Sequence, residues 1–226
     1  RNLGLHISST FMLSKRKSQV PLNFSNWVGF APIFFNSDQA FKLQSLLHSK
    51  DEISIIQKSL NGNEYEAISF IYDEASLNNL QLHRKSNFLH LSTHSQFNPD
   101  TDQVGLCFIN NGQIRVLDYN KIIELNIQPE NVYLNVCSSS SYKFYDGEGP
   151  INLNRAFLLN GANNIVFTTR RVIDTFATEF AIVFYQNLSK TQNFSISLAD
   201  AKREMIKSDK YKSPIYWSNY QLIYTN

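Results

Sequence analysis

The sequence predicts an α/β fold: a single doubly wound domain with a mostly parallel sheet and helices on both faces. The 226 residues allow one large domain or two small ones. Short apolar runs rich in Val, Ile and aromatic residues recur along the chain, mostly without alternation, as in strands that are buried on both faces. Helical patterns separate these runs. Strand–helix–strand alternation implies parallel strands joined by right-handed crossovers.

Six apolar runs are the predicted strands, at residues 27–34, 67–72, 88–91, 132–136, 164–167 and 220–224. One segment, residues 105–116, departs from the parallel pattern. It holds two apolar runs on either side of Asn110-Asn111-Gly112, a turn sequence that favours a β-hairpin. We therefore expect a hairpin inserted into the parallel fold.

Four helical patterns lie between the strands, and each has a polar residue that can cap its start. The expected pairs of cap and helix are Asp51 with 52–60, Asn152 with 153–160, Asp174 with 175–188, and Ser197 with a helix that continues past 205. Ser197 and Asp200 have the spacing of a capping box. The helix at 175–188 is apolar around most of its circumference, so we expect it to be largely buried.

Composition and charge exclude several classes of protein. Lys and Arg number 21 against 19 Asp and Glu, a net charge of +2, so no strong field attracts nucleic acid or acidic lipid. No apolar run approaches the roughly 20 residues of a membrane span. Two cysteines, Cys107 and Cys137, are too few for a disulfide scaffold and fit a cytoplasmic location. No metal-ligand, phosphate-loop or dinucleotide motif occurs, so we expect no cofactor.

The candidate site follows two of the strands, at the point where each ends. In open α/β sheets, ligands bind outside the carboxyl ends of the strands. The strand at 88–91 leads to His94, and the strand at 132–136 runs directly into Cys137. If these strands are neighbours, the two residues emerge side by side, and an imidazole beside a thiol favours the nucleophilic thiolate. The pair predicts a cysteine nucleophile, although a cysteine that ends a buried strand is most often a small apolar core residue.

The other cysteine and histidines give weaker signals. Cys107 lies inside an apolar run and is expected in the core. His90 lies inside a strand, so we expect it to be a buried residue with hydrogen-bond partners, in the core or supporting the site. No clear partner is evident for His6, His48 or His83.

Six segments resemble the CHAT domain, a family of caspase-like cysteine proteases related to separase and often fused to tetratricopeptide repeats. In chain order they are FLHLSTHSQFNPD, VYLNVCSSSS, GEGPINLNRAFLLNGANNIVFTT, FYQNLSKT, SLADAKREM and SPIYWSNYQLIY. The resemblance implies that residues 1–226 form one caspase-like domain, a three-layer α/β fold with a mostly parallel central sheet. It also implies that this chain lacks the family's N-terminal strand and an upstream sensor or repeat module.

Position by position, the resemblance makes His94 the catalytic histidine and Cys137 the nucleophile. The backbone N–H groups of Ser95 and Cys137 would then form the oxyanion hole. The family usually has Gly at the position of Ser95, and Thr-Gly shortly after the nucleophile where this chain has serines.

The resemblance also places a substrate pocket, which would receive the residue on the amino side of the cleaved bond. The segments after the cysteine strand and after the next strand would line it, and they contribute Ser138, Arg170, Arg171 and Asp174. Because two guanidinium groups repel a cation, we expect a small, polar, apolar or acidic residue there rather than Lys or Arg.

The resemblance predicts a cysteine endopeptidase that is gated by a sensor module and cleaves a partner protein in bacterial signalling or defence. Its substrate would be a protein or peptide, and its partner a tetratricopeptide-repeat or sensor module. The alternative is a catalytically silent CHAT fold that acts as a scaffold or interaction module. Ser95 and the missing Thr-Gly favour this alternative, whereas the intact pair of His94 and Cys137 favours the enzyme.

Overall fold

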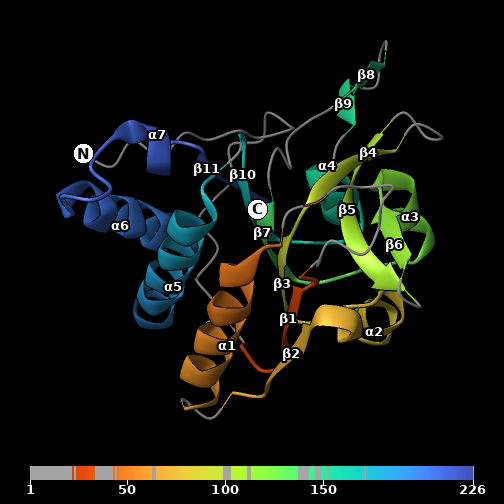
Figure 1. The fold of residues 1–226 in the computed structure, drawn as a ribbon, viewed down its shortest axis with the longest axis horizontal. Helices are drawn as coiled ribbons and strands as arrows, with labels where there is room; N and C mark the ends of the chain where they lie inside the picture. Colours follow the sequence, from red (N-terminus) through yellow and green to blue (C-terminus); the bar gives the residue numbers. More distant parts are fainter. Residues whose placement is uncertain are drawn as a thin grey trace.

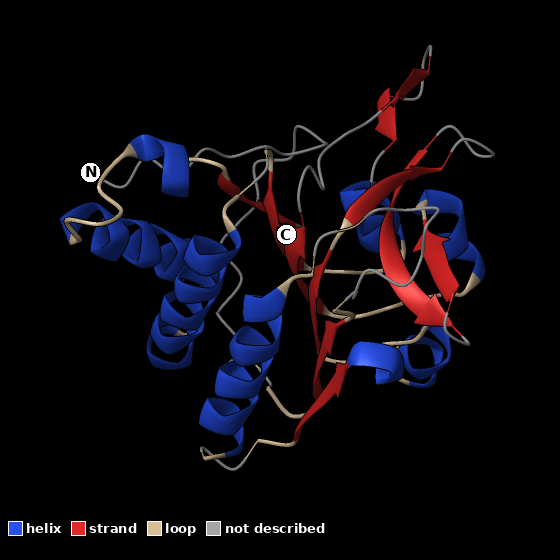
Figure 2. Cartoon of the chain, in the orientation of Figure 1, coloured by secondary structure: helices blue, strands red, loops and turns tan. Residues whose placement is uncertain are grey.

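The computed structural model shows an α/β fold of three layers (Figures 1 and 2). It describes residues 22, 24–33, 43, 45–62, 65–98, 103–110, 113–136, 143–145, 149–151, 153–170 and 172–225. The strands are β1 (Trp27–Ala31), β2 (Ala67–Ile71), β3 (Phe88–Thr93), β4 (Ser95–Asn98), β5 (Gln103–Asn110), β6 (Gln113–Leu117), β7 (Asn131–Val136), β8 (Lys143–Tyr145), β9 (Gly149–Ile151), β10 (Asn164–Thr168) and β11 (Tyr220–Tyr224). The helices are α1 (Leu47–Asn61), α2 (Leu77–Leu82), α3 (Tyr119–Glu124), α4 (Leu153–Leu159), α5 (Asp174–Thr191), α6 (Phe194–Lys207) and α7 (Pro214–Trp217), with a 3-10 turn, η1 (Tyr72–Glu74).

The central layer is a six-stranded sheet in the order β11-β10-β7-β3-β1-β2. Its strands run parallel except β11, which pairs antiparallel with β10 at one edge. β3 and β7 lie side by side at the centre, with Ser92 opposite Asn135 and Thr93 opposite Val136. The mostly parallel sheet predicted from the sequence is therefore confirmed. The two strands that lead to His94 and Cys137 are neighbours.

Two hydrophobic cores cover the two faces of this sheet. Helices α1, α5 and α6 pack on one face, and α2, α3, α4 and a second sheet pack on the other (Figure 1). Successive side chains of a strand point to opposite cores: in β3, Phe88 faces the first and Leu89 the second, and in β7 Tyr133 and Leu134 do the same. Burial on both faces explains why the strand sequences do not alternate between apolar and polar residues.

The predicted hairpin forms β5 and β6, which pair antiparallel. The second sheet has a further strand that the sequence did not indicate: β4 begins directly after His94 and pairs with β5, in the order β4-β5-β6. Positions 111 and 112 of the expected turn lie outside the described residues. Cys107 of β5 is fully buried, which confirms its expected place in the core.

The starts of α1 and α5 differ from the expected caps. α1 begins at Leu47 rather than after Asp51, and α5 begins at Asp174 itself. The reason is a tertiary contact: Asp174 Oδ2 accepts a hydrogen bond from His48 N at 3.2 Å. A carboxylate from α5 thus serves the first turn of α1, where the preceding residue, Leu46, makes no side-chain cap.

The start of α6 also differs from the prediction. The helix begins at Phe194, three residues before the expected cap. Asn193 is the cap instead, because its Oδ1 accepts from Ile196 N at 2.9 Å. Ser197 lies inside the first turn and donates to Asn193 O at 2.6 Å. The expected cap of α4, Asn152, lies outside the described residues.

Candidate active site

A pocket opens at the carboxyl edge of the central sheet, between the ends of β3, β7 and β10 and the first turns of α1 and α5. The described residues that line it are Leu46, Ser49, Ser92, Thr93, His94, Asn135, Val136, Thr168, Val172, Asp174 and Ala177. Hydroxyl and amide groups make up much of this lining. Among the lining residues that the structure describes, His94 and Asp174 are the ones with ionisable side chains.

The main chain at His94 is fixed by Cys107 of β5. Cys107 N donates to His94 O at 2.9 Å, and Thr93 Oγ1 donates to Cys107 O at 2.7 Å. Thr93 and Cys107 are both buried, so water does not compete for these hydrogen bonds. Burial raises the pKa of the Cys107 thiol to about 12, so this thiol stays protonated at neutral pH and is a poor nucleophile. Cys107 supports the site through its main chain.

Ser95 is the first residue of β4 and lies opposite Leu106 of β5. Because the neighbouring bond joins Cys107 N to His94 O, Ser95 and Leu106 form a non-hydrogen-bonded pair, and the Ser95 N–H points away from β5. The φ of Ser95 is not positive. Serine therefore meets no backbone strain here that glycine would relieve, which removes one physical reason to expect a silent fold.

Asp174 and Arg170 take different positions relative to the pocket. Asp174 lines it, with Oδ2 bonded to His48 N at the positive end of α1. Arg170 follows β10, is exposed, and is not among the described residues of the lining. The other expected site residues, Cys137, Ser138 and Arg171, lie outside the described residues.

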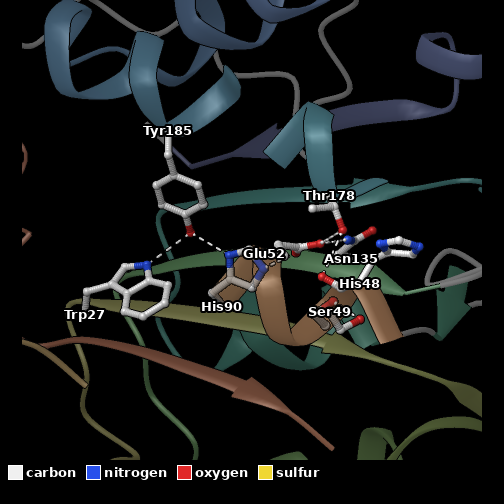
Figure 3. A network of polar contacts seen from close by, with 9 residues as sticks. Trp27, His48, Ser49, Glu52, His90, Asn135, Thr178 and Tyr185 are labelled. Carbon is white, nitrogen blue, oxygen red and sulfur yellow. Dashed lines mark hydrogen bonds and ion pairs between the residues drawn. The ribbon is translucent and has the colours of Figure 1, made fainter. Parts of the chain in front are cut away.

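A chain of buried polar groups lies next to the pocket, between α1, α5 and the sheet (Figure 3). Glu52 of α1 is at its centre: Oε1 is 2.7 Å from His90 Nε2, and Oε2 accepts from Asn135 Nδ2 at 2.7 Å. On the other side of the imidazole, His90 Nδ1 is 3.0 Å from the Tyr185 hydroxyl, which also accepts from Trp27 Nε1 at 3.2 Å. The expectation that His90 is buried with hydrogen-bond partners is confirmed.

Sequence reasoning did not single out Glu52, Asn135 or the bonded pair Ser49 and Ser92, whose hydroxyl groups are 2.8 Å apart. A signal existed for Glu52, because it lies three residues after Ser49 and four before Ile56, on the buried stripe of α1. Asn135 had a weaker signal: it is a polar residue inside an otherwise apolar strand.

The arrangement suits proton transfer by a side chain rather than metal chemistry at the described positions. His94 places an imidazole at a polar pocket, where it can accept a proton from, or donate one to, a bound molecule. Within the described ranges, no three His, Cys, Asp or Glu side chains are grouped as a metal ion requires. No helix in the described part of the chain is long and apolar enough to cross a membrane.

Three solved structures align with this one. Separase of Saccharomyces cerevisiae, in its complex with securin, aligns over 89% of this chain with 12% sequence identity and a TM-score of 0.56. The Arg-specific cysteine proteinase gingipain R aligns over 90% with 9% identity and a TM-score of 0.55. Caspase-1 of Spodoptera frugiperda aligns over 98% with 11% identity and a TM-score of 0.48. This chain spans 12% of the separase chain, 46% of the gingipain chain and 92% of the caspase chain. No curated protein matches its sequence.

At these identities, the likeness to separase and gingipain establishes the fold alone. It confirms the α/β class with a mostly parallel sheet that the sequence resemblance implied. The sequence profile of the CHAT domain matches residues 9–225, nearly the whole chain. The chain therefore belongs to the CHAT domain family.

Proposed function

We propose that this chain is a cysteine endopeptidase in which Cys137 is the nucleophile and His94 transfers the proton. The register of β3 and β7 carries the proposal, because Thr93 and Val136, the last residues of these strands, lie opposite each other. His94 and Cys137 each follow by one peptide link, with Cα atoms about 3.8 Å apart along the chain. Since adjacent strands are about 4.8 Å apart, we expect the two side chains to meet at the same edge of the sheet.

The proposed reaction has two halves. The Cys137 thiolate attacks the carbonyl carbon of the peptide bond, and the N–H groups of Ser95 and Cys137 donate to the oxyanion that forms. His94 then protonates the departing amine, the C–N bond breaks, and a thioester remains on Cys137. A water molecule attacks the thioester while His94 takes its proton, which releases the carboxylic acid and restores the thiol.

We place the side chain on the amino side of the cleaved bond in the pocket beside His94. Asp174 is the acidic group of its described lining, and the His48 N–H and the positive end of α1 partly offset that charge. Arg170 is exposed, so the repulsion of a substrate Lys or Arg that the sequence predicts would come from Arg171. The hydroxyl-rich lining favours a small uncharged residue at this position.

Cleavage of a peptide library tests the assignment of the two catalytic residues. Cys137→Ala and His94→Ala should each lower kcat/KM by about 1,000-fold or more, while each folds like the parent. Cys107→Ala is the matched control and should cleave at the parent rate, because its thiol is buried and protonated. Parent-level cleavage by either of the first two variants would show that the dyad is wrong. A parent that cleaves nothing, both alone and in the longer protein with its activating signal, would favour the silent scaffold.

The same library tests the pocket assignment. The parent should show no strong preference for Lys or Arg on the amino side of the cut. Arg170→Ala should leave the cleavage profile unchanged, because the side chain is exposed. A clear preference for Lys or Arg that disappears in Asp174→Asn would contradict the proposal, and would show that the Asp174 carboxylate dominates the pocket.

We also propose that a tetratricopeptide-repeat or sensor module controls this domain. The aligned part makes up only 12% of the separase chain and 46% of the gingipain chain, so both chains contain further segments beside this fold. If the proposal holds, adding the natural neighbouring region, with and without its activating signal, should change the cleavage rate. Equal rates for the domain alone and for the longer protein under all conditions would contradict it.

A further inference from the structure

Glu52 is a fully buried carboxylate, with no exposed side-chain surface. Burying a carboxylate is unfavourable unless hydrogen-bond donors compensate for the lost water, and apolar residues of the same volume would often be as stable. Two nitrogen atoms face it, His90 Nε2 at 2.7 Å and Asn135 Nδ2 at 2.7 Å. Thr178 Oγ1 lies 3.3 Å from Glu52 Oε2 and shares its single hydrogen with His48 O at 3.2 Å. These three residues come from β3, β7 and α5, so this single side chain of α1 joins four elements.

One assignment of the hydrogens satisfies the groups along this network (Figure 3). The Trp27 indole N–H can only donate, so the Tyr185 oxygen accepts from it. In this assignment the Tyr185 hydroxyl donates to His90 Nδ1, and the imidazole N–H at Nε2 faces Glu52 Oε1. Burial raises the pKa of Tyr185 well above its ordinary value, so the phenol keeps the hydrogen that this bond needs. Tyr185 and Glu52 thus contact the His90 imidazole from its two nitrogen sides.

The network contacts β7 beyond the point where this strand stops pairing with β10. β10 pairs with β7 from Asn131 to Tyr133, and the pocket opens beyond that point. There, Glu52 holds the side chain of Asn135, and Thr168 Oγ1 donates to Val136 O. The Glu52 carboxylate therefore supports the carboxyl end of β7, directly before Cys137.

The network also reaches β3, at His90, which lies opposite Tyr133 of β7. His90 lies four residues before His94, and Asn135 lies two before Cys137. Glu52 bonds both His90 and Asn135, yet it does not line the pocket. Its hydrogen bonds to β3 and β7 connect it to the two strands that lead to the dyad.

We propose that Glu52 is a positioning residue of the peptidase site, which holds the carboxyl ends of β3 and β7 in the alignment that brings His94 and Cys137 together. The proposal rests on the proposed peptidase function. Because Glu52 is outside the pocket, its loss should disturb the alignment of the reacting groups more than the binding of substrate. A misplacement of about 1 Å costs on the order of 100-fold in rate.

Glu52→Gln is the primary test, because glutamine has the same shape but only one acceptor oxygen. His90 and Asn135 face different oxygens of Glu52, so the NH₂ group of the glutamine must face one of them. We expect kcat, corrected for the folded fraction, to fall about 10- to 100-fold while KM changes by less than about threefold. Asn131→Ala is the matched control at the other end of β7. It removes buried hydrogen bonds to Asn87 O and from Asn164 Nδ2, and should leave kcat within about twofold of the parent.

Tyr185→Phe keeps the proposal falsifiable if Glu52→Gln does not fold. It deletes one oxygen, the one that orients His90, and lies outside the pocket. We expect kcat to fall about threefold or more with KM unchanged. If Glu52→Gln folds and keeps the kcat of the parent, the proposed role of Glu52 is wrong. If only Tyr185→Phe folds, a parent-level kcat in that variant has the same meaning. A loss of kcat in Asn131→Ala as large as that in Glu52→Gln would also overturn the proposed role. A parent that is inactive both as the domain alone and in the longer protein with its activating signal overturns the peptidase function itself, and the role of Glu52 with it.

Discussion

The stability conferred by Cys107 is predicted to depend on pH, with a sign that the structure determines. The thiol is buried in β5, and burial raises its pKa from 9.0 to about 12. In the unfolded chain the thiol loses its proton above about pH 9, whereas the folded protein retains it until about pH 12. The contribution of Cys107 to stability is therefore complete below pH 9 and is lost as the pH rises toward 12.

Comparing the parent with Cys107→Ala isolates the pH dependence of stability that comes from the Cys107 thiol. At pH 7 the substitution removes a buried sulfur and should lower the free energy of unfolding by about 1–2 kcal/mol. Between pH 9 and pH 11 the parent loses about 1.4 kcal/mol per pH unit through the thiol, or about 3 kcal/mol, which the variant does not lose. The variant should thus be less stable than the parent at pH 7 and more stable at pH 11, with equal stability near pH 10.

Urea unfolding from pH 7 to pH 11 measures this crossing. Both proteins should carry Cys137→Ala, so that they differ only at Cys107. Other groups that titrate in this range, such as Tyr133 and Tyr185, are common to both and cancel in the difference. Two stability curves that run parallel from pH 7 to pH 11 would contradict this prediction, because they would mean that folding does not shield the Cys107 thiol from water.

Two further predictions concern packing around the site and are tested by urea denaturation. Asp174→Ala should lower the free energy of unfolding by about 1 kcal/mol, because His48 N loses its acceptor at the start of α1. Asp174→Asn, which keeps an acceptor oxygen, should cost less, and equal costs would show that the hydrogen bond contributes nothing. Gly105→Ala should cost about 2 kcal/mol or more, because the added Cβ would lie 2.8 Å from the main-chain oxygen of Leu117. Gly62→Ala, whose Cβ meets nothing nearer than 3.5 Å, is its control, and similar midpoints for the two variants would contradict the close approach.

The parts of the fold that depend on local pattern could be predicted from the sequence. The strands β3, β7, β10 and β11 were found within two residues at each end, because burial on both faces produces continuous apolar runs. Helix starts were less predictable, because their caps depend on the fold. α1 is served by Asp174 from another helix, and α6 uses Asn193 although Ser197 matched a capping box.

Only those parts of the candidate site that directly follow a predicted strand could be predicted from the sequence. That His94 lies at the carboxyl edge of the sheet followed from the position of its strand. Glu52 was missed because a single carboxylate in a helix is usually solvated, and nothing in the sequence shows that His90 and Asn135 will face it. The exposed position of Arg170 depends on how the chain turns after β10, which no local pattern specifies.

Labelling with a peptide-linked electrophile, followed by intact-mass and peptide mass spectrometry, tests whether Cys137 is a nucleophile activated by His94. We expect one adduct per chain, on Cys137, formed at least about 10-fold more slowly in His94→Ala and absent in Cys137→Ala. Cys107 should remain unlabelled in the folded protein because its thiol is buried. An adduct that persists in Cys137→Ala would contradict the role of Cys137, and so would a folded parent that forms none, either alone or in the longer protein with its activating signal.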